Sequence, residues 1–145
     1  MKVEFHSGVA DKLGVACRFL CKAQAAGAAV VVCGDPADLD RLDVALWTFD
    51  PLSFVAHARL KAAATPTPQL ARTPVWLVDD PASIATRDLL VNLGPAMAQG
   101  WQAFQRVVEI VSTETDDANA GRQRWREYSA CAGIELIHYP RGPSA

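Results

Sequence analysis

Several features that define common classes of protein are missing from this chain of 145 residues. It has no apolar run of about 18 residues, the length that a membrane-spanning helix needs, so we expect no membrane contact. The amino-terminal segment MKVEFHSG is too poor in apolar residues for a secretory signal, which predicts a soluble, cytoplasmic protein. The formal net charge is −2, from 14 basic and 16 acidic side chains, so strong direct binding to nucleic acid is not expected.

Metal and redox chemistry also lack their usual signatures. No Cys-x-x-Cys pair occurs, and the three histidines do not cluster in sequence with the cysteines. We therefore expect buried free thiols, as in a reducing compartment, and no metal or other cofactor. The four cysteines are Cys17, Cys21, Cys33 and Cys131.

Catalytic and nucleotide-binding motifs are absent too. The chain has neither GxxxxGK[ST] nor GxGxxG, and no serine, cysteine or histidine lies in a nucleophile elbow. An enzyme in its own right is therefore not expected. One alternative stays open, a small nucleotide-binding α/β domain that uses the loop after the first strand. That loop runs from Gly8 to Gly14 and includes Lys12, and its backbone amides could hold a phosphate.

The apolar segments that are present alternate between strand-like and helix-like patterns, which predicts one α/β domain over residues 1–139 and a frayed tail at 140–145. The run AAVVVC has no polar residue, as expected for a central parallel strand covered on both faces. We expect three layers, with helices on both sides of a mostly parallel sheet, a Rossmann-like arrangement without a phosphate-binding loop. Strands are expected at 3–6, 28–33, 74–79, 87–93, 107–111 and 134–139, and helices at 11–27, 36–47, 95–105 and 115–132. For the short apolar run at 87–93 a helix is the alternative.

The segment from Arg41 to Leu60 carries more apolar residues than one helix face can bury. On a helical wheel three leucines face the core, and Trp47 lies on the flank of that stripe, half exposed. The loop after this helix adds four more apolar side chains, Phe49, Leu52, Phe54 and Val55. Such a cluster near a helix end is more often an interface than a catalytic pocket. The alternative is that Phe54 and Val55 pack onto the sheet and belong to the core.

The last predicted helix carries the second candidate surface, GRQRWREYS at residues 121–129. Arg122 and Arg126 lie one turn apart on the same flank, beside Trp125, whereas Arg124 points elsewhere. Two guanidiniums beside an indole ring suit an acidic peptide that ends in an aromatic residue, because they hold its carboxylate while the ring provides an apolar wall. One alternative is a solvated helix face without a binding partner. Another is DNA binding through the three arginines, although such binding needs more phosphate contacts than three arginines supply.

Both surfaces resemble those of one family, the chi subunit of bacterial DNA polymerase III. In the central segment the matching pattern is LW followed by SFVAH, with Ala56 at the position of the family's proline. In the last helix it is RQRWREY followed by AG, with Ala118 at a basic position of the family. The matching residues are Leu46, Trp47, Ser53, Phe54, Val55 and His57, then Arg122, Arg124, Trp125, Arg126, Tyr128 and Gly133.

The resemblance implies a non-catalytic accessory subunit that bridges the clamp loader to single-stranded-DNA-binding protein during DNA replication. It implies docking of the psi subunit of the clamp loader on Trp47, Leu52, Phe54, Val55 and His57. It also implies that the acidic, phenylalanine-terminated tail of single-stranded-DNA-binding protein is held by Arg122 foremost, with Trp125, Arg126 and Val111.

Overall fold

The computed structural model describes residues 1–48, 55–60, 73–79 and 88–140, and these ranges contain seven strands and three α-helices. The strands are β1 (Lys2–Val9), β2 (Val30–Cys33), β3 (His57–Leu60), β4 (Val75–Val78), β5 (Leu89–Asn92), β6 (Arg106–Ser112) and β7 (Glu135–Pro140). The helices are α1 (Lys12–Ala25), α2 (Pro36–Thr48) and α3 (Thr115–Ser129), with a short 3-10 helix at Trp101–Ala103. None of these helices is both long and apolar enough to cross a bilayer.

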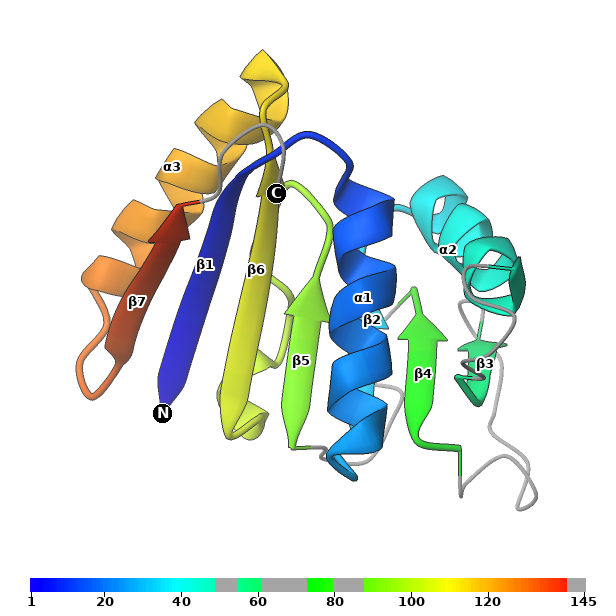
Figure 1. The fold of residues 1–145 in the computed structure, drawn as a ribbon. Helices are drawn as coiled ribbons and strands as arrows, with labels where there is room; N and C mark the ends of the chain where they lie inside the picture. The colour runs from blue at the N-terminus through cyan, green and yellow to red at the C-terminus, as the bar shows by residue number, and fades with distance from the viewer. Residues whose placement is uncertain (49–54, 61–72, 80–87, 141–145) are drawn as a thin grey trace.

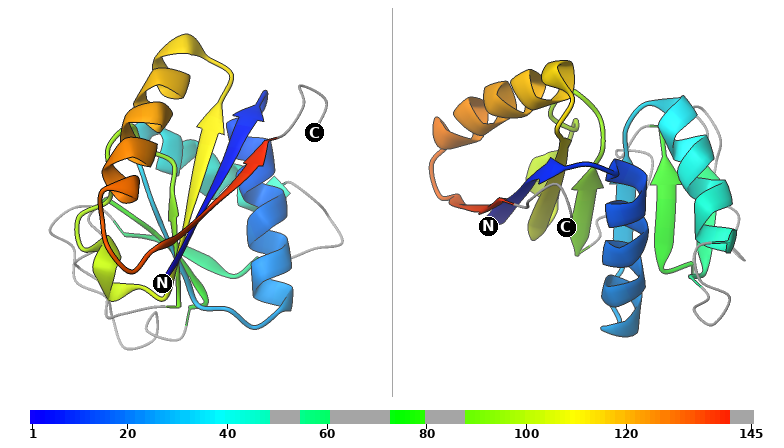
Figure 2. Two further views of the ribbon diagram at one scale, coloured as in Figure 1. Left: turned by 90° about the vertical axis from the view of Figure 1, so that its left-hand side faces the viewer. Right: turned by 45° about the horizontal axis from the view of Figure 1, so that its top comes forward.

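All the described strands pair in parallel in one sheet, in the order β3-β4-β2-β5-β6-β1-β7 (Figure 1). The connections through α1 and α2 run toward the β3 edge, whereas the connection through α3 runs toward the β7 edge. Because parallel crossovers are right-handed, opposite directions place the helices on opposite faces. Figure 2 shows the result, with α3 on one side of the sheet and α1 on the other. The predicted three-layer α/β fold with a parallel sheet is confirmed.

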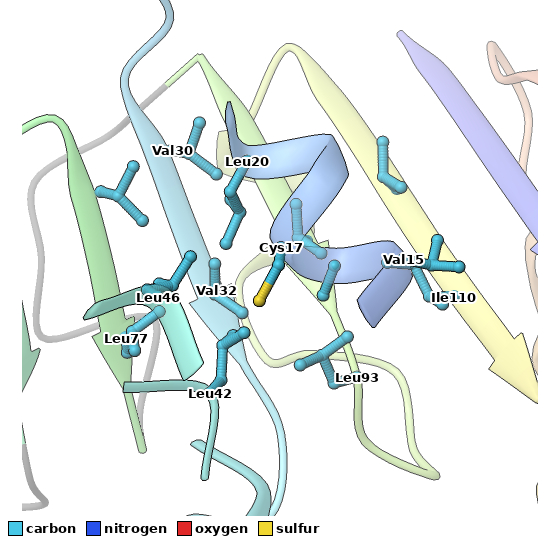
Figure 3. Packing of buried hydrophobic residues seen from close by; sticks show 14 of the residues in the cluster. Val15, Cys17, Leu20, Val30, Val32, Leu42, Leu46, Leu77, Leu93 and Ile110 are labelled. Carbon is cyan, nitrogen blue, oxygen red and sulfur yellow. The ribbon is translucent and has the colours of Figure 1, made fainter. Parts of the chain in front are cut away.

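Each face of the sheet carries its own hydrophobic core. Val30 and Val32 of β2 point into the core under α1 and α2, while Val31 and Cys33 point into the core under α3. This alternation follows from the two-residue period of a strand, and it explains why β2 contains no polar residue. Figure 3 shows the first core, where Leu20 of α1 and the leucines of α2 meet the valines of the sheet.

Local sequence signals set the ends of the first two helices. The Asp11 carboxylate accepts a hydrogen bond from the Gly14 N–H (3.1 Å) and so caps the start of α1. Gly27, just after α1, has a φ of 80°, a left-handed conformation that stops a helix at little cost for glycine. In α2, Pro36 occupies the first position and Asp38 lies in the first turn, where the helix dipole favours a negative charge.

The predicted helix at 95–105 is wrong. Only the 3-10 helix forms there, preceded by Gly100 in the left-handed region at a φ of 77°. Trp101 and Phe104 are nevertheless buried in the core under α3, so their helical spacing reflected burial and not helical structure. The last helix is also shorter than predicted, because α3 ends at Ser129 and Ala132 is exposed.

Strand β3 was not predicted, because its sequence HARL lacks a continuous apolar pattern. It forms one edge of the sheet, where Arg59 pairs with Asp40 (3.0 Å) and Asp79 (2.5 Å). Charged residues on an edge strand also discourage pairing with a further strand. The predicted limit of the domain falls next to the end of β7, and the expected tail beyond Pro140 lies outside the described residues.

Candidate functional site

A buried ion pair anchors α3 to the sheet. The Arg124 Nε donates to the Glu109 Oε1 of β6 at 2.9 Å, and both side chains are almost completely buried. The Tyr128 hydroxyl donates to the other carboxylate oxygen (2.8 Å), and Asn92 of β5 donates to both oxygens. Arg124 therefore points into the molecule and offers no charge to a phosphate, so an arginine triplet for DNA binding does not form.

The pKa values in this cluster follow from its burial. Burial raises the pKa of Glu109, while the Arg124 guanidinium and the hydrogen bonds from Tyr128 and Asn92 oppose that shift. Burial also raises the pKa of Tyr128, and the neighbouring Glu109 carboxylate raises it further. The Tyr128 hydroxyl thus keeps its proton and remains a donor that fixes α3.

Beside this anchor a groove of about 710 Å³ lies between α3 and the strands β1, β6 and β7. The helix side of the groove includes Gly121, Arg122, Trp125 and Arg126. The sheet side includes Phe5 and Ser7 of β1, Val111 of β6 and His138 of β7. We call this feature the α3 groove. It brings together all four residues that the resemblance assigned to the tail of single-stranded-DNA-binding protein.

Aromatic rings form the apolar wall of the α3 groove. The Trp125 ring meets the Phe5 ring edge to face, with centroids 5.2 Å apart, and meets the His138 ring at 5.8 Å in a similar geometry. The helix approaches the sheet closely at Gly121, where an added Cβ would lie 2.8 Å from a methyl carbon of Val111. The shape of the groove therefore depends on a residue without a side chain.

Two positive charges stand at the rim of the α3 groove. The Arg122 Nη1 donates to the Asn119 Oδ1 at 2.8 Å, which orients the guanidinium without neutralising it. Arg126 is exposed one turn later. Among the described residues no carboxylate lies within ion-pair distance of either arginine. An anionic group next to an apolar side chain would find both of its requirements in this groove.

Sequence reasoning did not find Phe5, Ser7 and His138. Their strands pair in parallel, with Phe5 opposite His138 in the register. Because β1 and β7 come from opposite ends of the described chain, only the fold brings them next to α3. The available signal was the alternation along each strand, which places Phe5 and Ser7 on the same face.

The other candidate surface lies around the end of α2. Val44 and Trp47 are exposed by 63% and 57%, one turn apart on the outer side of the helix. The Trp47 ring rests on the buried His57 ring, with centroids 4.7 Å apart. The His57 Nδ1 contacts the Val55 carbonyl oxygen at 2.7 Å, and Nε2 contacts the Asp43 Oδ1 at 2.9 Å. The Trp47 indole is therefore exposed to solvent while the buried His57 ring holds it in place.

The remaining residues assigned to psi have different positions. Val55 is buried in the core under α1 and α2, so it packs beneath this surface. Leu52 and Phe54 lie outside the described residues. We call the exposed patch of Val44 and Trp47 the α2 surface. The helices α2 and α3, which carry the α2 surface and one side of the α3 groove, lie on opposite faces and near opposite edges of the sheet (Figures 1 and 2).

The loop after β1 does not have the properties of a phosphate site. Asp11 occupies the start of α1, and the Lys12 ammonium is paired with Asp117 of α3 at 3.1 Å. The crevice at the carboxyl ends of the strands is rich in acidic residues, which repel phosphate. These residues are Asp11, Asp35, Asp38, Glu114, Asp116 and Asp117. The nucleotide-binding alternative thus gains no support from this end of the sheet.

No group of three or more histidine, cysteine or acidic side chains is arranged for metal binding within the described ranges. The four cysteines are free thiols, as predicted. The prediction of burial holds for Cys17 and Cys33, and burial raises the pKa of Cys17 to about 11. Cys21 is only half-buried, and the prediction is wrong for Cys131, which is exposed in the turn after α3.

Comparison with known proteins gives a consistent result. The sequence profile of the family described as DNA polymerase III chi subunit, HolC, matches residues 1–136. The chain is 33% identical to DNA polymerase III subunit chi of Pseudomonas aeruginosa over 118 residues, which cover 81% of this chain and 78% of that protein. It is 27% identical over 117 residues to subunit chi of Haemophilus influenzae, covering 78% and 76% of the two chains. The resemblance inferred from the two motifs is thereby confirmed.

Solved structures show the same fold in proteins of unrelated sequence. The C-terminal domain of the DEAD-box protein Dbp5 superposes with a TM-score of 0.63 at 13% identity, covering 97% of this chain and 90% of that domain. A complex of S. cerevisiae Dbp5 gives a TM-score of 0.59 at 11% identity, covering 94% of this chain and 41% of that one. At such identities the likeness concerns the fold alone.

Proposed function

The chain belongs to the family of DNA polymerase III chi subunits, and on that premise we propose that it is a non-catalytic adaptor of the replication machinery. One surface would bind the psi subunit of the clamp loader, and the other would bind the carboxyl-terminal tail of single-stranded-DNA-binding protein. The chain would then connect the polymerase assembly to template that is coated with that protein.

The α3 groove carries the proposal for the tail. An acidic peptide with a terminal phenylalanine needs cations for its carboxylates and an apolar wall for its ring. Arg122 and Arg126 offer guanidiniums that no described carboxylate neutralises, and Trp125 and Val111 line the space beside them. Because the net charge of the whole chain is negative, attraction of an acidic peptide has to come from this local arrangement.

Calorimetric titration with the acidic tail peptide tests this role. Wild type is expected to bind, and Arg122→Ala to lose about 2 kcal/mol, the size of an interface hot spot and about 30-fold in affinity. Arg18→Ala is the matched control, because Arg18 is an exposed arginine on α1, away from the α3 groove. Failure of wild type to bind, or equal losses in both variants, would contradict the proposal.

The α2 surface supports the proposal for psi. Val44 and Trp47 expose apolar surface to solvent, and its burial against a partner would be favourable. Exposed aromatic residues of this kind are typical of interfaces. Trp47 and its support His57 were both expected at this interface, and only Trp47 is accessible for direct contact. The roles of Leu52 and Phe54 stay predictions.

A further inference from the structure

His138 is a polar residue of the α3 groove that the motifs do not include. It is exposed on β7 and lines the groove opposite the helix that carries Arg122 and Arg126. The His138 Nε2 is hydrogen-bonded to the Ser7 Oγ of β1, and the His138 and Trp125 rings are in T-shaped contact. Strand pairing and an aromatic contact therefore fix the ring on the sheet side of the groove.

The hydrogen bond to Ser7 leaves one nitrogen for a ligand. Nδ1 of His138 has no hydrogen-bond partner among the described residues. If the Ser7 hydroxyl donates to Nε2, then Nδ1 of the neutral ring carries the proton and is a donor. If the ring is protonated, Nε2–H donates to Ser7, and Nδ1–H donates with the added attraction of a positive charge.

We propose that His138, oriented by Ser7, is a third anchor of the α3 groove, which binds a carboxylate of the acidic tail through Nδ1. This inference rests on the proposed function and adds a specificity residue from the sheet side. The peptide would be held between arginines on the helix and an imidazole on β7. Such a grip from two sides favours a peptide with several acidic residues over one with a single carboxylate.

The proposal predicts that the affinity for the tail depends on pH. Among the described residues that line the α3 groove, the other charged side chains are Arg122 and Arg126 of α3. The residues that β1 and β6 contribute to the lining, including Phe5, Ser7 and Val111, are uncharged. Histidine side chains generally change charge between about pH 5 and 8, while peptide carboxylates stay ionised there. Binding should therefore become tighter as the pH falls.

Calorimetric titration with the tail peptide at about pH 8 and about pH 6 tests this anchor. Wild type should bind about tenfold more tightly at the lower pH, the effect of one hydrogen bond that becomes charge-assisted. His138→Leu, which keeps an apolar contact with Trp125, should lose this dependence. His138→Gln keeps a neutral donor, so it should retain most of the affinity at the higher pH without the increase at the lower pH.

Two further variants separate the outcomes. Arg122→Ala should bind more weakly at both pH values and keep the ratio between them. Tyr139→Phe is the control on the same strand, since Tyr139 stacks on His6 and does not line the α3 groove. If wild type and His138→Leu have equal affinities for the peptide at each pH, and Arg122→Ala has a lower affinity, the proposed role of His138 is wrong while the proposed tail site is supported. If wild type does not bind at either pH, both proposals fail.

Discussion

Gly121 sets the distance between α3 and the sheet. Its α-carbon approaches Val111 so closely that an added Cβ would lie 2.8 Å and 2.9 Å from the two methyl carbons of that valine. Carbon atoms in ordinary contact are about 3.5–4.0 Å apart, so either the helix or the valine has to move. Both residues line the α3 groove, and any such movement changes its width.

We predict that Gly121→Ala weakens binding of the tail peptide and lowers the free energy of unfolding by about 1–3 kcal/mol, as overpacking usually does. Val111→Ala removes the two methyl groups that the new Cβ would meet. The double variant should therefore recover stability relative to Gly121→Ala, as measured by urea denaturation. A double variant less stable than both single variants would show that the approach at Gly121 is not the cause.

At the scale of the elements, Asp117 connects the two helical layers. It lies in the first turn of α3, where its carboxylate accepts hydrogen bonds from the Ser112 backbone N–H (2.6 Å) and from the Lys12 ammonium of α1 (3.1 Å). Partial burial alone would raise the pKa of Asp117, but the Ser112 N–H and Lys12 outweigh that effect and lower it. One side chain thus ties the end of β6 to helices on both faces.

The lowered pKa gives a pH dependence of definite sign. The folded state holds the Asp117 proton less tightly than the unfolded state, so the contribution of this carboxylate to stability is complete above the ordinary aspartate pKa. It is lost as the pH falls through the lowered value. Wild type should exceed Asp117→Asn in unfolding free energy near pH 6, and the difference should shrink toward about pH 3. Asp116→Asn, an exposed neighbour in the same turn, is the control and should differ little from wild type at either pH.

At the scale of the whole molecule, the two candidate surfaces are independent in position. The helix α2 lies near the β3 edge, and α3 lies near the β7 edge on the opposite face (Figure 1), so the α2 surface and the α3 groove are far apart. Trp47→Ala should therefore weaken binding of psi by about 2 kcal/mol or more and leave binding of the tail peptide unchanged, as measured by calorimetry with each partner. Loss of both activities in a folded variant would contradict an adaptor with two separate sites.

The sequence predicts those parts of the molecule that depend on local patterns. The apolar run of β2, the helical spacing over 11–27 that predicted α1 and the spacing of Arg122 and Arg126 each reflect short stretches of chain, and the structure has the elements that they indicate. The 3-10 helix and β3 could not be predicted in the same way. Trp101 and Phe104 are buried from an irregular segment, and Arg59 gains its ion pairs only from residues distant in sequence.

The same distinction between local and long-range patterns applies to the α3 groove. Its helix side was predicted because one short stretch of a single helix, from Gly121 to Arg126, carries it. Its sheet side was missed because Phe5 and His138 become neighbours only through the pairing of β1 with β7. Arg124 shows the same limit, since the helical wheel turned it away from the other arginines but did not reveal the buried Glu109 that receives it.

The position of β1 also has a consequence for synthesis. This strand lies between β6 and β7, so the first of the described strands in chain order pairs with the last two of them. Contacts between distant parts of a chain slow folding, and an apolar strand is prone to aggregate until its partner strands have been synthesised. The α3 groove takes residues from β1, β6, α3 and β7, so it has no complete form before β7 has been made. If the α3 groove binds the tail peptide as proposed, a nascent chain that still lacks β7 cannot hold it.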